Sequence, residues 1–188
     1  MKKIFWIPVA VAAALTVPAC TNKQGETESP VFITINLPSQ PLIVTSTSTT
    51  LSCATAPCPV QIATITLVSH LKNIAATDPQ GFANVQVSFY QVEYFRRDGG
   101  TRVPQNQEFA AAGLLASNGT LTLSGFPILA GAALVQSPFD QLLPFNGGVD
   151  RETGLTEIHV FYRLTFFGQT VAGQRVQSET AIGDFFVR

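Results

Sequence analysis

The most regular pattern in this chain is an alternation of apolar and other side chains between residues 158 and 167. One set of alternate positions holds Ile158, Val160, Tyr162, Leu164 and Phe166, and the other holds His159, Phe161, Arg163, Thr165 and Phe167. Successive side chains of a β-strand point to opposite faces, whereas a helix repeats its apolar positions every three to four residues. The alternation therefore predicts a strand whose first set of side chains faces a core.

Further strands are expected wherever the same alternation recurs between turn residues. The expected strand regions are Val31 to Leu37, Leu42 to Val44, Ile62 to Val68, Val85 to Tyr94, Thr120 to Leu123 and Gln174 to Val187. Asp98-Gly99-Gly100 and Asn118-Gly119 predict turns, because Asp, Asn and Gly tolerate a positive φ. Gly168 to Gly173 predicts a hairpin loop, and residues 101 to 118 are expected to form a long excursion between strands.

One strand is expected to be irregular. The apolar positions of this strand change from odd numbers, at Val85, Val87 and Phe89, to even numbers, at Val92 and Tyr94. An extra residue in a strand produces such a change, so we expect a β-bulge near Tyr90-Gln91.

A single short helix is expected in the second half of the chain. Ser137 has the residue type of an N-cap, Pro138 suits the first helical position, and Asp140 follows three residues after the cap. Pro144 ends the helix, because proline cannot continue it.

Two long segments carry a resemblance to a known class of domain. Val85 to Gly100 and Ile158 to Val176 each combine aromatic alternation with a Gly-containing turn. They resemble the central strands of bacterial immunoglobulin-like and fibronectin-type-III-like domains. The strand pattern predicts an all-β fold over residues 31–188, an antiparallel two-sheet β-sandwich with one short helix, and the resemblance implies that this sandwich is immunoglobulin-like.

The first 19 residues are typical of a cleaved secretory signal peptide. Two lysines follow Met1, and the uncharged run from Ile4 to Ala19 is shorter than the ~20 residues that span a bilayer. The run ends in Val17-Pro18-Ala19-Cys20, which resembles the lipobox of bacterial lipoproteins. That resemblance implies cleavage before Cys20 and acylation of its thiol and its new amino group.

The residues after Cys20 indicate where such a protein would be held. Residues 20–30 are expected to form a flexible tether, because the stretch from Thr21 to Pro30 has no apolar side chain to bury. Thr21 stands where an Asp commonly retains lipoproteins at the inner membrane, so the resemblance favours the outer membrane. The implied partner is the membrane itself, through the lipid anchor in the cell envelope.

The cysteine count is consistent with an exported protein. Acylation of Cys20 leaves Cys53 and Cys58 as a pair, and a disulfide between them is expected in an oxidising compartment. A disulfide that closes so short a loop stabilises the fold by only about 2 kcal/mol, because it constrains little of the unfolded chain. The spacing is not that of a Cys-x-x-Cys redox motif.

No catalytic or cofactor constellation is visible, and we expect a protein that is not an enzyme. Gly-x-Ser-x-Gly and His-Glu-x-x-His motifs are both missing from the sequence. His159 falls in an expected strand and His70 near the end of one, which favours a structural role for both. One Met, one Trp and two His leave little material for a haem, copper or zinc site, so no cofactor is expected. A net charge of -1 excludes a nucleic-acid footprint.

Two charged clusters need an interpretation. Asp150-Arg151-Glu152 offers oxygen ligands for Ca²⁺, but Arg151 opposes a cation there, so a solvated turn is favoured. Arg96-Arg97 beside Asp98 is expected to supply edge charges that discourage aggregation between strands.

Large apolar side chains give the remaining functional hint. These are Phe139, Leu142, Leu143, Phe145, Phe161 and Phe167, which either cover a second small core or form an exposed partner patch. We therefore expect a non-enzymatic binding or scaffold module with a partner in the envelope. The alternative is a structural subunit of a cell-surface assembly that uses aromatic faces and edge strands such as Val31 to Leu37. An envelope hydrolase with an unrecognised site is a third possibility.

Overall fold

The computed structural model of this protein describes residues 29–38, 41–44 and 58–188. The predicted signal peptide, Cys20, most of the tether and Cys53 lie outside these residues. In the described part the strands are β1 (Val31–Asn36), β2 (Leu42–Val44), β3 (Val60–Leu71), β4 (Val85–Arg96), β5 (Gln107–Leu115), β6 (Thr120–Leu129), β7 (Ile158–Thr170), β8 (Arg175–Gln177) and β9 (Ala181–Val187). The 3₁₀ helices are η1 (Gly131–Val135), η2 (Phe139–Leu142) and η3 (Pro144–Asn146).

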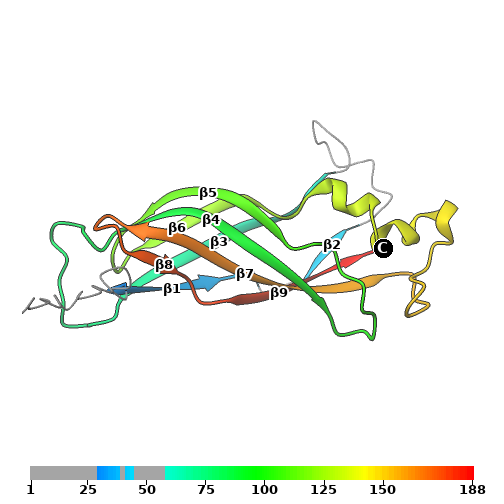
Figure 1. The fold of residues 1–188 in the computed structure, drawn as a ribbon, viewed down its shortest axis with the longest axis horizontal. Coiled ribbons are helices and arrows are strands. Elements are labelled where there is room, and N and C mark those ends of the chain that lie inside the picture. Colours follow the sequence, from blue (N-terminus) through cyan, green and yellow to red (C-terminus); the bar gives the residue numbers. More distant parts are fainter. Residues whose placement is uncertain (1–28, 39–40, 45–57) are drawn as a thin grey trace, which may run out of the picture.

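The strands form two sheets, which confirms the predicted all-β, two-sheet architecture (Figure 1). The smaller sheet has the order β1-β3-β6, and the larger has the order β2-β9-β7-β4-β5 with β8 paired to the end of β7. One pair departs from the expected antiparallel pattern, because β2 runs parallel to β9. The chain leaves β1 in the smaller sheet and continues as β2 at the edge of the larger one.

The core lies between the sheets and is built as the alternation predicts. Ile158, Val160, Tyr162, Leu164 and Phe166 are all buried. Among the other fully buried large side chains are Tyr90, Phe185, Ile33, Ile62 and Ile128. The hydroxyl groups of Tyr90 and Tyr94 donate hydrogen bonds to the backbone oxygens of Pro127 and Ile128 in the facing sheet. Each ring thus contributes apolar area while its polar atom is satisfied.

The bulge in β4 exists, but it lies two residues earlier than predicted. The register of β4 with both neighbours shifts between Val87 and Phe89. Val87 and Tyr90 both face the core, whereas Phe89 is half-buried on the outer face. The prediction failed because Phe89 is apolar and was assigned inward, although it pairs with another outward ring, that of Phe167.

Gly168 lies inside β7 beside this bulge, and not in a hairpin loop as predicted. A Cβ at Gly168 would overlap the backbone oxygen of Gln86. We expect Gly168→Ala to lower the free energy of unfolding by about 1–3 kcal/mol, because backbone atoms must move to make room. Gly113→Ala is the control, since a Cβ there meets only the flexible end of Leu121 and should cost less than about 1 kcal/mol. Chemical denaturation of both variants measures the difference, and equal losses would contradict this account.

Residues 101–118 are not the strandless excursion that we predicted. β5 occupies Gln107–Leu115 and pairs with β4. Its Ala-rich sequence, with Ala110 and Ala112 exposed, does not show the alternation of large side chains that marks the other strands. The Asn118-Gly119 turn is confirmed, and Asn118 has the expected positive φ of 55°.

The predicted helix is replaced by short 3₁₀ turns. Pro138 is itself the N-cap of η2, and no side chain caps that helix. Pro138 and Pro144 lie too close together to leave room for a regular α-helix between them. In the described part of the chain no helix is long and apolar enough to cross a bilayer.

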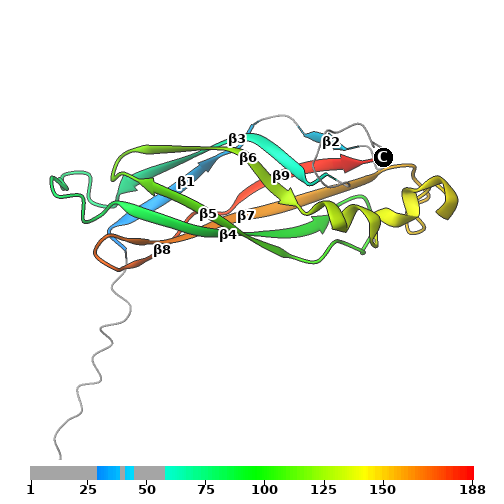
Figure 2. The same ribbon diagram turned by 90° about the horizontal axis from the view of Figure 1, so that it is seen from above.

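The molecule is elongated, and its two ends carry different parts of the chain (Figures 1 and 2). We call one end the entry end: it holds Ser29 and Pro30, the loop 72–84 and the turn 171–173. The other, the distal end, holds the loop 97–106, the three 3₁₀ helices and the C-terminus. The strands of the sandwich run between the two ends.

Candidate functional site

The distal end of the larger sheet gathers most of the charged groups that the sequence singled out. The alternation of side chains along β4 explains which of these groups face the core and which face outward. Tyr94 faces the core, so Arg96 follows it inward while Phe95 and Arg97 lie on the other side. The two adjacent arginines therefore serve different purposes, and the prediction that treated them as one set of edge charges was wrong for Arg96.

Arg96 is the centre of a buried charge network. Its side chain has 0% exposure, and Nε and Nη2 each donate to one oxygen of Asp98 at 2.8 Å. Nη2 also donates to Asp150, whose side chain is equally buried, and Nη1 lies 3.5 Å from Glu152 Oε2. Gly100 is required beside this group, because a Cβ there would overlap the guanidinium. Three carboxylates from two loops thus converge on one strand-end cation.

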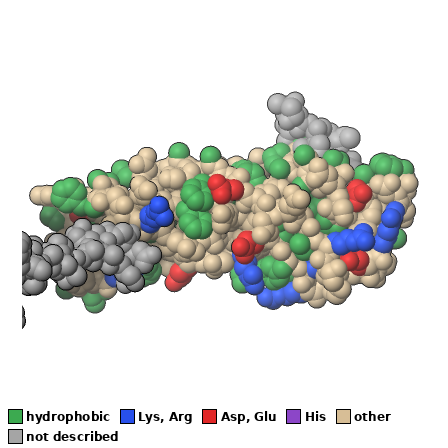
Figure 3. Space-filling model, in the orientation of Figure 1, with side chains coloured by type: hydrophobic (Ala, Val, Ile, Leu, Met, Phe, Trp, Pro, Cys, Tyr) green, Lys and Arg blue, Asp and Glu red, His purple; other side chains and the backbone are tan. Residues whose placement is uncertain are grey.

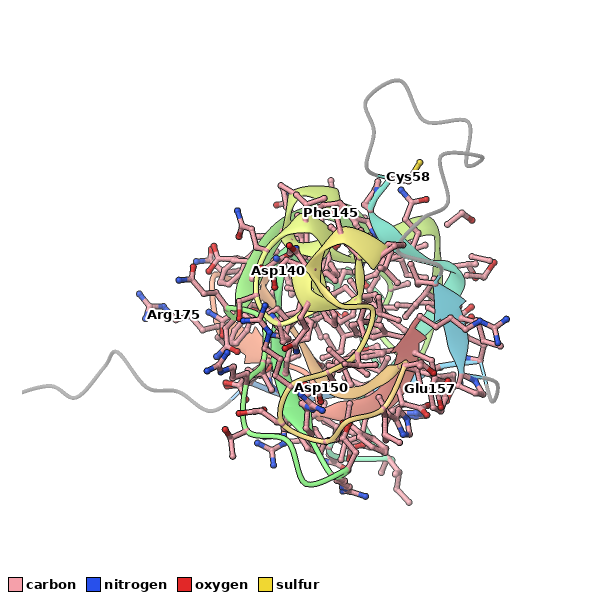
Figure 4. The ribbon with its side chains drawn as sticks, turned by 90° about the vertical axis from the view of Figure 1, so that its right-hand side faces the viewer. Cys58, Asp140, Phe145, Asp150, Glu157 and Arg175 are labelled. Carbon is pink, nitrogen blue, oxygen red and sulfur yellow. The ribbon has the colours of Figure 1, made fainter. Side chains whose placement is uncertain are left out.

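Further hydrogen bonds hold the acids in place. Asp150 accepts 2.7 Å bonds from Gln141 Nε2 and Thr153 Oγ1. Glu152 accepts from the backbone N–H of Thr101 at 2.7 Å and from its hydroxyl at 2.7 Å. Figure 4 looks onto the distal end and shows Asp150 beside the chain of η2 and η3, with Phe145 above it. The network joins the loop 97–106 to the loop 147–157.

The prediction of a solvated turn was wrong for Asp150, which is buried, whereas Arg151 and Glu152 do lie exposed in a turn. Arg151 is exposed, whereas Asp150 is buried against the opposite arginine. The guanidinium of Arg96 supplies the positive charge between the carboxylates. Across residues 29–38, 41–44 and 58–188, no group of three or more His, Cys, Asp and Glu side chains is arranged to hold a metal ion.

The network changes the acidity of its members. Burial alone would raise the pKa of Asp98, but hydrogen bonds from Arg96 and from the Gly100 N–H lower it below its ordinary value of 3.8. The pKa of Asp150 is lowered in the same way, with burial opposed by bonds from Arg96 and Thr153. Hydrogen bonds from the Arg102 N–H and the Thr101 hydroxyl lower the pKa of Glu152.

These shifts predict a loss of stability in acid. A carboxyl group whose pKa is lower in the folded state stabilises the fold above its unfolded pKa, and that contribution is lost as the pH falls through the folded value. We expect the free energy of unfolding to fall from about pH 4 downwards. Urea denaturation between pH 6 and pH 3 tests this. The free energy of unfolding of Asp98→Asn should fall less steeply with decreasing pH than that of the wild-type protein. An unchanged slope in Asp98→Asn would contradict the assignment.

The outer face beside this network carries an aromatic and cationic surface, which we call the platform. It consists of Phe95, Arg97, His159, Phe161, Arg163 and Phe186. Phe95 and Phe161 are register partners on β4 and β7, and their rings stack with centroids 5.5 Å apart. The guanidinium of Arg97 lies 5.3 Å from the first ring centroid and 4.9 Å from the second. A cation in this position is attracted by the negative faces of both rings.

The rest of the platform extends across β7 to β9. His159 stacks on Phe186 at 3.9 Å and shares a 2.8 Å contact between Nε2 and Asp184 Oδ2. Arg163 lies over Phe95 at 4.9 Å and is 3.9 Å from Glu93. Among the described residues, no carboxylate pairs with Arg97, and its side chain is exposed. Lys and Arg side chains cluster on the distal half of the face drawn in Figure 3.

A shallow polar hollow adjoins the platform along β4 and β5. It has a volume of about 230 Å³ and is lined by Gln91, Glu93, Asn106, Gln107 and Glu108. Its amide and carboxylate groups can accept and donate hydrogen bonds. Arg163 connects the platform to this hollow, since it lies near Glu93 in the hollow and over Phe95 in the platform.

The structure divides the apolar residues that the sequence grouped together. Phe139 and Leu142, the first and last residues of η2, are buried, as one of the two alternatives expected. Phe145 is 82% exposed at the distal end. Phe161 and Phe167 are half-buried on the outer face of the larger sheet, but in two separate stacked pairs.

The remaining residues that the sequence singled out lie elsewhere. His159 is on the outer face, as predicted, and His70 stacks on Phe32 at 4.9 Å on the smaller sheet. Cys58 is buried just before β3, and its expected bond to Cys53 stays a prediction because Cys53 lies outside the described residues. Cys20 likewise lies outside them.

Sequence reasoning missed the pairing of Arg96 with Asp150. The two residues are 54 positions apart, and nothing in their local sequence links them. The alternation of side chains along the strand did indicate that Arg96 points inward, because Arg96 stands two residues after the inward Tyr94.

No family model matches the chain, and no curated protein matches it either.

Proposed function

We propose that this protein is a lipid-anchored envelope lipoprotein that acts as a non-enzymatic binding module. The lipobox-like Val17-Pro18-Ala19-Cys20 supports the anchor, and Thr21 after Cys20 supports the outer-membrane location. An anchored protein of this kind needs a surface that meets its partner. The platform supplies one at the distal end.

An immunoglobulin-like assignment of the sandwich is part of this proposal. In such domains strands A, B and E belong to one sheet, and strands G, F, C and C′ to the other. The orders β1-β3-β6 and β9-β7-β4-β5 correspond to these two sets. This strand order supports the assignment independently of the aromatic pattern in the sequence.

The single observation that carries the binding function is the position of Arg97. Its charge is exposed, unpaired among the described residues and held over the rings of Phe95 and Phe161. A flexible arginine loses side-chain entropy when it binds, whereas one already held over two rings loses less. A partner segment with a carboxylate beside an apolar side chain matches this arrangement, and we assign the platform to such a segment of an envelope protein.

Photo-crosslinking from the platform tests the binding function. A photoreactive residue at Ile182, which is 54% exposed and is the register partner of Arg163, should give one discrete adduct in intact cells. The adduct should fall about fivefold in Arg97→Ala, the factor that corresponds to about 1 kcal/mol. The control places the same group at Leu114, which is 60% exposed on the outer face of β5 near the entry end. Equal adducts from both positions, or none from Ile182, would refute the platform.

A structural role in a surface assembly is the second candidate, and one observation favours it. β5 is an edge strand of nine residues whose only strand partner in the described part is β4. β5 carries one charged side chain, Glu108, and an edge bearing the small residues Ala110 and Ala112 can pair with another chain. Under this alternative Ala110→Lys dissociates an oligomer that sedimentation detects in the wild-type protein, and a wild-type monomer at high concentration excludes it.

A further inference from the structure

The entry end carries exposed apolar side chains that the proposed binding function does not use. Ile74 is 98% exposed, Phe82 56% and Val171 57%. Ile74 and Phe82 belong to the loop 72–84, and Val171 belongs to the turn between β7 and β8. We call these three side chains the apolar tip.

Hydrogen bonds hold these two segments together in a fixed shape. The N–H of Val171 donates to Asn84 O at 2.8 Å, and the N–H of Ala172 donates to Phe82 O at 3.1 Å. Asp78 accepts from the backbone N–H groups of Phe82 and Ala83, both at 2.9 Å. The loop therefore presents its apolar groups on an ordered backbone. Phe82 and Val171 thus lie on hydrogen-bonded neighbouring segments, and exposed apolar groups gathered at one end of a molecule mark a contact surface.

The chain enters the sandwich at the same end. Pro30 O accepts a 2.8 Å hydrogen bond from the N–H of Lys72, the first residue after β3. Ser29 is buried, and its hydroxyl accepts from the N–H of Val31 at 3.2 Å. The point where residues 1–28 join the described fold is thus fixed beside the start of the loop that carries Ile74 and Phe82 (Figure 2).

Chain length relates this end to the proposed anchor. From Cys20 to Ser29 an extended chain spans about 30 Å at most. A strand of 12 residues such as β4, which runs toward the distal end, is about 40 Å long. The tether therefore keeps the entry end within about 30 Å of the anchored residue, and the platform lies about one strand length from the entry end.

We propose that the apolar tip rests in the interface of the bilayer that holds the lipid anchor. Ile74, Phe82 and Val171 then lie among headgroups and the first acyl carbons, where apolar side chains are removed from water. The sandwich stands on its entry end and directs the platform away from the membrane. This inference rests on the anchor in the proposed function and adds an orientation to it.

Tryptophan fluorescence tests the contact. Trp6, the only tryptophan of the chain, lies in the predicted signal peptide, so the mature protein is expected to have none. Ile74→Trp places one reporter in the tip, and Phe145→Trp places one at the distal end, where Phe145 is 82% exposed. Phe82→Trp is a second tip variant. Each full-length variant is purified from membranes and reconstituted into phosphatidylcholine and phosphatidylglycerol vesicles with brominated acyl chains.

The expected result separates the two ends of the molecule. The tip reporters should shift to shorter wavelength and lose about half of their emission to the bromines, while the distal reporter keeps its emission. If the protein floats with the vesicles and tip and distal reporters are quenched equally, the tip contact is refuted and the anchor stands. If the protein does not float with the vesicles, the anchor is refuted and the tip contact with it. Tryptophan emission, excited at a wavelength that tyrosine does not absorb, from the protein without an introduced tryptophan would show that the signal peptide is retained, and this also refutes the anchor.

Discussion

Replacing Arg96 with alanine should lower the free energy of unfolding by about 3–5 kcal/mol, because it leaves buried carboxylates without their cation. Asp150 has a fully buried side chain, and that of Asp98 is only 12% exposed. Neither can be hydrated well enough in place to offset the lost charge. The two loops should also become more mobile in the folded variant, because the network joins the loop 97–106 to the loop 147–157.

Arg97→Ala is the matched control for this prediction. Arg97 is the neighbouring residue with the same charge, but it lies on the outer face over Phe95 and Phe161. Its removal should cost less than about 1 kcal/mol of stability. Urea denaturation of both variants at neutral pH provides the comparison. Arg96→Ala with a free energy of unfolding close to that of Arg97→Ala would show that the network does not stabilise the fold.

Cys20→Ala should move the protein from the membrane fraction to the soluble fraction almost completely. Several acyl chains hold a protein stably because each buried CH₂ contributes about 0.8 kcal/mol. The apolar tip adds too little apolar area to retain the protein without these chains. Cell fractionation followed by a high-salt wash measures the distribution.

Cys53→Ala separates the anchor from a general effect of losing a cysteine. This variant should stay in the membrane fraction and lose only about 2 kcal/mol of stability, because a bond to Cys58 closes a short loop. Salt removes proteins that are held by charge alone. A Cys20→Ala protein that still sediments with washed membranes would therefore contradict the anchor.

The sequence predicts the parts of this fold that depend on large alternating side chains. Ile158 to Phe166 follow the predicted inward pattern without exception. β5 escaped prediction because Ala110 and Ala112 provide no contrast between its faces. The predicted position of the β4 bulge was wrong for a related reason, because Phe89 is apolar but lies on the outer face.

The candidate site was predictable only in part, because it depends on contacts between distant segments. The outward position of Phe161, His159 and Arg163 followed from strand parity alone. The register that puts Phe95 against Phe161 requires knowing which strands are neighbours. The burial of Asp150 also depends on the path of the loop 147–157, and no local pattern encodes that path.

Metabolic labelling with radioactive palmitate tests the central claim of a lipid-anchored sandwich most directly. Cells producing the wild-type chain, Cys20→Ala and Cys53→Ala are labelled, and the protein is recovered under denaturing conditions. We predict label on the wild-type and Cys53→Ala proteins and none on Cys20→Ala. A wild-type protein that accumulates without label, or a Cys20→Ala protein that keeps it, would contradict the account.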